Sequence, residues 1–462
     1  MAINTGQSRE IERPAKSRRS RRRFVQSVVG LAGAAFLGGC DQSETSELTV
    51  QPTARSVATS PPRRIGLTLT GWPFRQDLLH VTLEAFRSQN PLIDVEFLEV
   101  LNDYRVRLDD LLVSPTPPNV VQVREGQAGA WWSRGLIRPL EEIPAFSDLA
   151  GRLRPAARAA IGPDGSIAGL PFYSDVMVLA YNRSMIDRIG GRPPDTWEEL
   201  SYFGRELRDR RISTSPFSLN FSPKVNANLP WWAMLFASGG RLLSNDGSAS
   251  GTDSAVRLLT ILRRMFVEDL VIDPSVNVTT YSAITSGDHA FALVGTYTAR
   301  RFADARDNLG GPDIGFATVP GLDGPGTGTV SWTPFYAIPA GAGEVESSAL
   351  LALHLGGVDG RGEFFSSRFW AQSEGLPPAY PEVLQDARVK ETFGSWIDLE
   401  FLDRVQSMGR PPDGIWQPWF ETWEHWAQDE VLRALWGRST PEDAVRAILE
   451  SASALRAKFG SQ

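Results

Sequence analysis

Short stretches of alternating apolar and polar residues are separated by stretches with helical spacing. Ile65, Leu67 and Leu69 alternate with small or polar residues, which is the period of a half-buried strand. Leu79, Leu83 and Phe86 then recur at the spacing of one helix face, and that helix is expected to stop before Pro91. The pattern predicts strands at residues 65–70, 93–97 and 120–123 and helices at residues 77–88, 104–113 and 127–134. Strands that alternate with helices in this way indicate βαβ units and a largely parallel sheet.

The second half of the chain is expected to be more helical. Helical spacing of apolar residues predicts helices at residues 252–268, 347–355, 362–372, 418–436 and 440–458. The last of these begins with Thr440-Pro441, a capping residue followed by proline in the first turn. The glycine-rich stretch 321–328 does not join a strand to a helix, so it predicts a loop and no nucleotide site.

The first 40 residues have the features of an export signal. Arg21-Arg22-Arg23-Phe24 carries a twin arginine, an apolar run follows, and Leu37-Gly38-Gly39-Cys40 resembles a lipoprotein processing box. The alternative, a transmembrane helix, needs about twenty apolar residues. We therefore expect a Tat-type signal peptide at residues 1–40, lipid on Cys40, and a flexible tether at 41–63 that is rich in Ser, Thr and Pro. Because the lipid occupies the only thiol, Cys40 is not a candidate nucleophile or metal ligand.

Charge and composition narrow the possible partners. The net charge is −7, and it becomes more negative once the basic signal segment is removed. Such an acidic protein is a poor candidate for binding nucleic acid. The length suits two domains, and the 14 tryptophans exceed what a core usually needs, so some could line a cleft.

Several sequence pieces together resemble the family 1 extracellular solute-binding proteins of ABC importers, which include maltodextrin-binding proteins. The most specific segment is 165–200, with Gly169-Leu170-Pro171, Tyr181-Asn182 and Thr196-Trp197-Glu198-Glu199-Leu200. Weaker pieces follow in the family's order: Pro118 to Gln122, Gly135 to Leu140, Trp231 to Gly240, Gly287 to Gly295, Val319 to Pro339 and Gly437 to Ala444. The order and spacing of the pieces carry the resemblance, which covers nearly everything from Ile65 onward.

The resemblance implies a two-lobed α/β fold of the periplasmic-binding-protein type (type II), with a ligand cleft between lobes joined by crossing strands. It places crossings near Leu170, Ala290 and Phe335. On this basis the N-lobe is expected at residues 64–172 and 290–335, and the C-lobe at 173–289 and 336–462. Independently, ligands of α/β sheets lie beyond the carboxyl ends of strands and at domain interfaces.

A sugar needs carboxylates or amides for its hydroxyls and flat aromatic rings for its C–H faces. By resemblance, Asp175 matches a carboxylate that contacts the ligand in maltodextrin binders, although an exposed loop acid is an alternative. Tyr173 would face the same side if the stretch is extended. Glu125 follows the strand at 120–123 and is a candidate, with Arg124 as an alternative. Trp72 follows the first strand and could line the cleft or the core.

The remaining candidates are aromatic. By resemblance, Tyr297 occupies a position that usually holds a stacking ring. Trp231 and Trp232 are adjacent, so one is expected to face the cleft and the other the core. Trp332 precedes a predicted crossing strand. Trp416, Trp419, Trp423 and Trp426 have helical spacing that favours a core face, with Trp423 the expected exception by resemblance.

These features predict a lipid-anchored receptor outside the cytoplasm that captures a sugar or oligosaccharide and passes it to an ABC permease. We expect a monomer without cofactor, metal or nucleic acid. The four histidines are far apart, and no nucleophile elbow or P-loop is present. A secreted carbohydrate-active enzyme and a sensory lipoprotein are the alternatives, since a pair of catalytic carboxylates could escape notice in a single sequence.

Overall fold

The computed structural model describes residues 63–101, 104–162, 164–219, 229–244, 246–272 and 280–460. They belong to one compact unit, Pro61–Gln462. The expected signal peptide, Cys40 and the tether up to residue 62 lie outside the described residues. Among the helices that are described, none is long and apolar enough to cross a bilayer.

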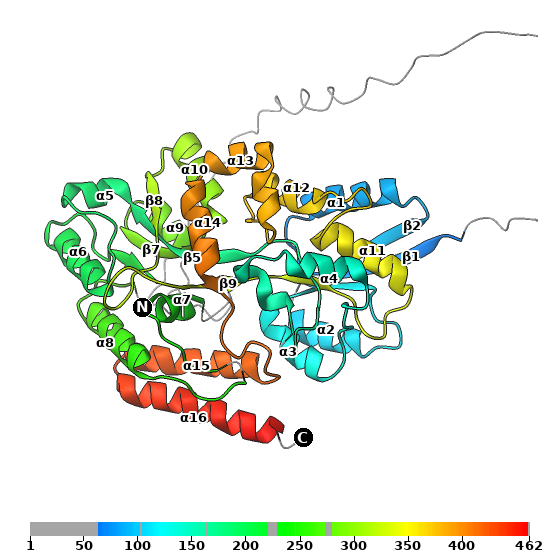
Figure 1. Ribbon diagram of the computed structural model, residues 1–462. Coiled ribbons are helices and arrows are strands. Elements are labelled where there is room, and N and C mark those ends of the chain that lie inside the picture. Colours follow the sequence, from blue (N-terminus) through cyan, green and yellow to red (C-terminus); the bar gives the residue numbers. More distant parts are fainter. Residues whose placement is uncertain are drawn as a thin grey trace, which may run out of the picture. The chain divides into compact units, whose positions relative to one another are not determined.

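The first sheet has the order β2-β1-β3-β10-β4 (Figure 1). Its strands are β1 (Ile65–Gly71), β2 (Ile93–Glu99), β3 (Val120–Val123), β4 (Leu170–Pro171) and β10 (Phe335–Ala337). β1 pairs in parallel with β2 and β3, whereas β10 is antiparallel to β3 and β4. The alternating apolar positions therefore predicted the first three strands correctly, and the parallel pairing follows from the βαβ pattern.

The second sheet has the order β11-β9-β5-β7-β6, with β8 paired to β5. Its strands are β5 (Asp175–Asn182), β6 (Phe217–Ser218), β7 (Phe291–Gly295), β8 (Ile314–Ala317), β9 (Thr329–Trp332) and β11 (Gly409–Arg410). β5 is buried along its whole length, because β7, β8 and β9 all pair with it.

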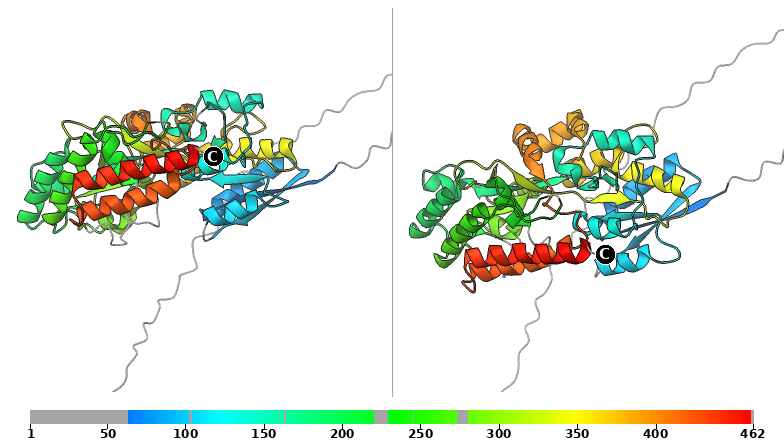
Figure 2. Two further views of the ribbon diagram at one scale, coloured as in Figure 1. Left: turned by 90° about the horizontal axis from the view of Figure 1, so that it is seen from below. Right: turned by 60° about the horizontal axis from the view of Figure 1, so that its bottom comes forward.

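Helices cover both sheets (Figures 1 and 2). They are α1 (Gln76–Gln89), α2 (Tyr104–Leu112), α3 (Glu125–Ser133), α4 (Pro144–Gly151), α5 (Arg183–Arg188), α6 (Trp197–Asp209), α7 (Leu229–Ala237), α8 (Asp253–Val267), α9 (Thr280–Thr285), α10 (Thr298–Leu309), α11 (Val345–Gly356), α12 (Phe365–Glu374), α13 (Ala387–Gly394), α14 (Leu399–Met408), α15 (Phe420–Leu435) and α16 (Pro441–Gly460). Two 3₁₀ turns, η1 (Pro155–Ala160) and η2 (Pro381–Gln385), complete the set of described helices. The helices predicted from spacing are all present, with ends shifted by a few residues. α16 starts as expected, with Thr440 Oγ1 accepting the Asp443 N–H at 3.1 Å.

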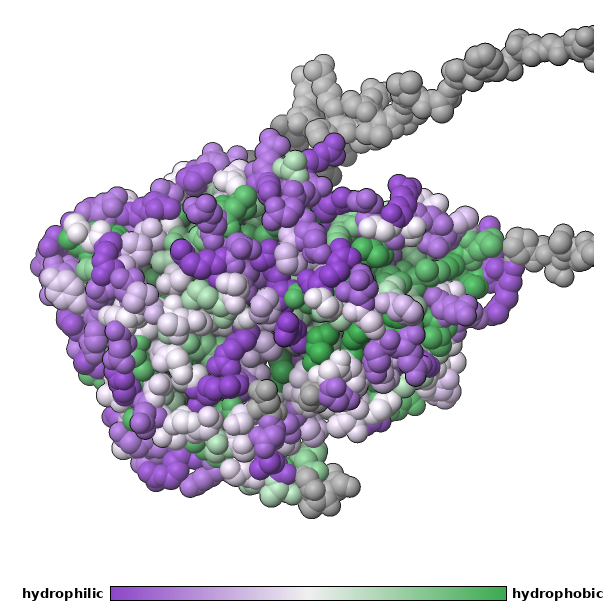
Figure 3. All heavy atoms as spheres, viewed as in Figure 1, coloured by the Kyte–Doolittle hydropathy of each residue, from purple (hydrophilic) through white to green (hydrophobic). Residues whose placement is uncertain are grey.

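We call the first sheet with α1–α4, α11 and α12 the N-lobe, and the second sheet with α5–α10, α15 and α16 the C-lobe. One apolar cluster packs the C-lobe helices against β5 and β7, and another packs α2 and α3 against β3 and β10. A third cluster runs from β1 and α1 through β5 to α10, so the two lobes share part of one core. Hydrophilic side chains cover most of the face in Figure 3, with apolar atoms gathered on the side of β1 and β2.

The strand pairing corrects the predicted lobe boundaries. Residues 290–335 were expected in the N-lobe, but β7, β8 and β9 pair with β5 in the C-lobe. Residues 336–374 were expected in the C-lobe, but α11 packs on β10 and α12 packs on α1. The chain passes between sheets at residues 172–174, at residues 333–334, and between α12 and β11. A buried strand that stays in its sheet and a strand that precedes a crossing have the same apolar pattern, so local sequence does not distinguish them.

Candidate functional site

Ser174 joins the three segments that connect the lobes. Its hydroxyl shares a 2.8 Å hydrogen bond with the Thr333 hydroxyl, on the second crossing. Its N–H donates to the Pro377 carbonyl at 3.0 Å, and its carbonyl accepts from Gln406 Nε2 at 3.1 Å, both within the third connection. Every polar group of this buried residue therefore ties one connection to another, so the three connections meet at one point.

Asp175, the first residue of β5, organises the turn between β7 and α10. Its carboxylate accepts the Thr296 N–H at 3.0 Å, the Thr296 hydroxyl, and the Tyr297 N–H at 3.3 Å. The side chain has no exposed surface. Burial raises the pKa of Asp175 to about 7, while the donors from Thr296, Val176 and Tyr297 oppose the rise. In this conformation Asp175 positions Tyr297 instead of presenting its oxygens to a ligand.

Three predicted aromatic residues gather beside Asp175. The Tyr297 ring meets the Trp332 ring edge to face, with centroids 6.5 Å apart. Tyr173 and Tyr297 are half-buried, and Trp332 is 8% exposed. Burial raises the pKa of Tyr173 well above its usual value, the charges of Asp175 and Glu125 raise it further, and a hydrogen bond with Trp332 opposes the rise. The structure therefore brings together side chains from the β4–β5 connection and the start of β5, the β7–α10 turn, the end of β9 and the start of α3.

The N-lobe supplies a second aromatic group at the carboxyl ends of β1 and β3. Trp72 follows β1, and its ring meets that of Tyr104 edge to face at 5.5 Å. The Arg124 guanidinium, just after β3, lies 5.2 Å from the Trp72 ring and 5.7 Å from the Tyr104 ring. Such cation–π contacts hold the guanidinium against both rings. Tyr104 was missed by sequence reasoning, because its helix was recognised but nothing local indicates which face meets Trp72.

Two half-buried carboxylates come from opposite lobes. Burial raises the pKa of Glu125, at the start of α3, to about 7, opposed by the backbone N–H groups of Glu125 and Thr333 and by Arg124. Burial also raises the pKa of Glu424, on α15, to about 7, and the charges of Glu125 and Glu421 add to the rise. Glu424 Oε1 accepts the Trp232 indole N–H at 2.9 Å. Glu424 was not predicted, although the tryptophan-rich stretch around it was.

The pKa values of Glu125 and Glu424 predict how stability depends on pH. Their ordinary value is 4.5, so between about pH 4.5 and 7 the folded protein holds protons that the unfolded chain has lost. The contribution of these groups to the free energy of unfolding is therefore full below pH 4.5 and is lost as pH rises through 7. Urea unfolding between pH 5 and 8 should show this decline, and the decline should become shallower in Glu125→Gln/Glu424→Gln, where only Asp175 still has a pKa raised to about 7 among these three carboxyl groups. Glu84→Gln, an exposed site on α1, should keep the slope; an unchanged slope in the double variant would contradict the assignment.

The lobes also touch through α3 and the turn before α15. Trp132 and Trp416 rings meet edge to face at 5.8 Å, and Arg105 on α2 pairs with Glu421 on α15 at 3.3 Å. A methyl group on Gly129 would lie 2.5 Å from the Trp416 carbonyl oxygen. Glycine at this position therefore allows the close approach of the two backbones.

Replacing Gly129 with alanine should consequently lower the free energy of unfolding by about 1–3 kcal/mol, the usual effect of overpacking. Gly126→Ala on the same helix is the matched control, since the nearest neighbour of its methyl among the described residues would be Phe420, at 4.0 Å. That control should be neutral or slightly stabilising, because alanine favours helix. Equal urea midpoints for the two variants would show that the α3 contact is not tight in solution.

The other tryptophans that were predicted to contact the ligand lie in the C-lobe core, whereas Trp426, which was expected on a core face, is 39% exposed. Trp231, Trp232 and Trp423 are each 1% exposed. The Trp423 indole N–H donates to the Ile448 carbonyl on α16 at 2.9 Å, so its ring is directed into the helical layer. This corrects the expectation that Trp423 and one of the Trp231–Trp232 pair face the ligand. Trp232 affects the site indirectly, by holding Glu424.

The described residues contain no group of three or more His, Cys, Asp or Glu side chains able to hold a metal ion. His289 binds the Ser215 carbonyl, and buried His354 binds the Thr82 carbonyl. The arrangement at the lobe junction consists instead of aromatic rings beside carboxylates, which suits binding of a polar ligand with apolar faces.

Comparisons with known proteins agree with this architecture. A family model of bacterial extracellular solute-binding proteins matches residues 82–392. The chain resembles maltose-bound MalE3 of T. maritima, with 18% identity, a TM-score of 0.68, and 85% of this chain and 100% of the other covered. It also resembles an ABC transporter solute-binding protein of Thermotoga lettingae bound with α-D-tagatose, with 19% identity, a TM-score of 0.69, and 85% and 100% coverage.

An ABC transporter solute-binding protein of Agrobacterium vitis S4 with bound D-mannitol gives 18% identity, a TM-score of 0.65, and 86% and 99% coverage. At these identities the likeness establishes the fold, so the predicted two-lobed α/β binding-protein fold is confirmed. Because the family model matches well over half of the chain, the protein belongs to the bacterial extracellular solute-binding protein family.

Proposed function

We propose that this protein captures a sugar, oligosaccharide or polyol between its lobes and delivers it to an ABC importer. The observation that carries the proposal is the pairing of aromatic rings with carboxylates at the lobe junction. Trp72 and Glu125 come from the N-lobe, whereas Tyr297, Trp332 and Glu424 come from the C-lobe. The family supports the transport role.

The chemistry of these groups matches a hydroxyl-rich solute. A carboxylate accepts hydrogen bonds from two adjacent hydroxyls, and a protonated carboxyl group also donates one. An aromatic face covers the C–H side of a sugar ring. Relatives of the same fold bind maltose, α-D-tagatose and D-mannitol, and these solutes share hydroxyls and lack charge.

Capture works by hinge closure. The two crossings and the third connection meet at Ser174, so the lobes can rotate about one point. A ligand shifts the balance toward the closed form only if it binds that form more tightly, which requires contacts with both lobes. Micromolar affinity, about −8 kcal/mol, would permit both capture and release.

The site of action is outside the cytoplasm, as the family implies. We propose that export uses the twin-arginine signal at residues 1–40 and that lipid on Cys40 anchors the chain to a membrane. A permease of the importer would then receive the solute directly from the anchored protein. Mass spectrometry of the membrane-extracted protein should find an acylated N-terminal Cys40; an unmodified residue would refute the anchor.

The function is tested with the full chain carrying Cys40→Ser. Calorimetry against maltose, α-D-tagatose, D-mannitol and a wider sugar library should find saturable binding, and product analysis should find the sugar intact. Tyr297→Ala should weaken that binding about tenfold or more, whereas Tyr202→Ala, an exposed ring on α6, should not. Release of hydrolysis products would support a carbohydrate-active enzyme instead, and no binding across the library would contradict the proposal.

A further inference from the structure

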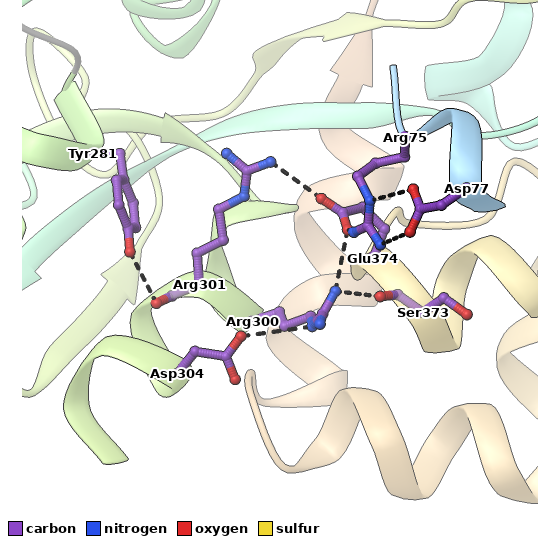
Figure 4. Close-up of polar contacts among 8 residues, drawn as sticks. All are labelled: Arg75, Asp77, Tyr281, Arg300, Arg301, Asp304, Ser373 and Glu374. Carbon is purple, nitrogen blue, oxygen red and sulfur yellow. Dashed lines mark hydrogen bonds and ion pairs between the residues drawn. The ribbon is translucent and has the colours of Figure 1, made fainter. Parts of the chain in front are cut away.

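A buried carboxylate at the end of α12 binds three guanidinium groups. The Glu374 side chain is 6% exposed, and its oxygens pair with Arg75, with Arg300 at 3.2 Å and with Arg301 at 3.2 Å (Figure 4). The Arg300 guanidinium also donates to the Ser373 carbonyl. Charge-assisted hydrogen bonds of this kind are stronger and more directional than neutral ones.

The three arginines come from both lobes. Arg75 precedes α1 of the N-lobe, and its backbone is left-handed with φ of 44°. Arg300 and Arg301 lie in the first turn of α10, between β7 and β8 of the C-lobe. Glu374 ends α12, where the third connection between the lobes begins. One carboxylate thus holds both lobes beside the hinge.

The same network reaches Tyr297 of the proposed binding site. The Arg301 guanidinium lies 5.1 Å from the centre of the Tyr297 ring, and Nη2 of the same guanidinium pairs with Glu374. The Arg301 carbonyl accepts the Tyr281 hydroxyl at 3.1 Å, which fixes the start of α10 from the other side (Figure 4). Gly375, next to Glu374, would place a Cβ 3.6 Å from the Tyr297 carbonyl.

The outer ends of the network are exposed and provide controls. Asp77 binds Arg75 at 2.8 Å and is 66% exposed. Asp304 lies 3.7 Å from Arg300 and is 57% exposed. Exposed ion pairs contribute little, because water and salt screen them. Removal of one partner from a buried pair has a far larger effect, because the other charges lose their compensation.

We propose that Glu374 is a positioning residue, which orients Tyr297 through Arg301 and sets how the two lobes lie relative to each other. Glu374 does so without contacting the ligand. The consequence for affinity rests on the proposed function, but the effects on Tyr297 and on lobe separation do not.

The test uses the ligand-free full chain with Cys40→Ser and compares Glu374→Gln with Asp77→Asn. Hydrogen exchange should quicken roughly tenfold at the amides of residues 296–301 in Glu374→Gln, as local opening becomes easier, and should stay unchanged in Asp77→Asn. Spin labels at Val113→Cys and Val267→Cys, exposed positions on opposite lobes, should report a broader distance distribution for Glu374→Gln only. Wild-type exchange and distances in that variant would overturn the proposal.

Arg301→Met tests whether Glu374 acts on Tyr297 through Arg301. Arg301 is more exposed than Glu374, so this variant keeps the test possible if Glu374→Gln unfolds. This single change should also speed exchange at residues 296–301. Combining it with Glu374→Gln should add little, because both changes break one chain of contacts. If the effects of the two changes on the exchange rates add fully, or if exchange is unchanged in Arg301→Met, Glu374 serves local packing alone. All of these measurements remain decisive even if the protein binds no sugar.

Discussion

Replacing Trp423 with alanine is expected to lower the free energy of unfolding by about 4 kcal/mol, the usual effect of deleting a buried tryptophan. Its ring packs against those of Trp232, Trp419 and Phe420, with centroids 5.9–6.1 Å away. The change leaves a cavity between α7, α15 and α16 and removes the hydrogen bond to the Ile448 carbonyl. Urea unfolding followed by circular dichroism measures the loss.

Trp426→Ala is the matched control on the same helix, since this ring is 39% exposed. It should change stability by less than about 1 kcal/mol. A Trp423→Ala protein with near wild-type stability and poor sugar binding would reverse our assignment. It would restore the sequence-based hypothesis that this ring contacts the ligand.

Asp175→Ala is expected to lower the free energy of unfolding by about 3 kcal/mol. The Thr296 hydroxyl and the Tyr297 N–H would lose their acceptor, whereas the Thr296 N–H would keep the Val176 carbonyl at 3.1 Å. Each unsatisfied buried donor costs about 1–3 kcal/mol. The same variant should bind sugar poorly, because the turn that presents Tyr297 is no longer held. Denaturation and calorimetry on one preparation give both quantities.

Asp307→Ala provides a comparison, because this acid is 59% exposed and pairs with neighbouring Arg306. It should alter stability by no more than about 0.5 kcal/mol. Lost binding with unchanged stability in Asp175→Ala would mean that the carboxylate contacts the ligand directly. In that case the closed arrangement around Thr296 would have to open in solution.

Local patterns predicted the elements well and their long-range pairing poorly. Alternation at residues 65–70 and helical spacing at 77–88 are properties of neighbouring residues, and β1 and α1 formed there. β7 and β5 pair antiparallel although more than 100 residues separate them. Nothing in the run Phe291–Gly295 specifies its partner, so the predicted lobe boundary near Ala290 was misplaced.

The site shows the same division between local and long-range information. Trp72 and Glu125 were predicted because both follow parallel strands, whose carboxyl ends meet at one edge. Asp175 was selected by resemblance, but its burial depends on Thr296 and Tyr297, 121 and 122 residues away. Glu374 ends α12, Arg300 and Arg301 lie in α10, and Arg75 directly precedes α1. No spacing in the sequence brings these residues together.

Small-angle X-ray scattering during titration with a bound sugar tests the central claim most directly. If the lobes rotate about Ser174 and shut on the solute, the radius of gyration should fall on saturation, while chromatography recovers the sugar unchanged. A radius that stays constant at full occupancy, or a sugar recovered as fragments, would contradict capture by closure.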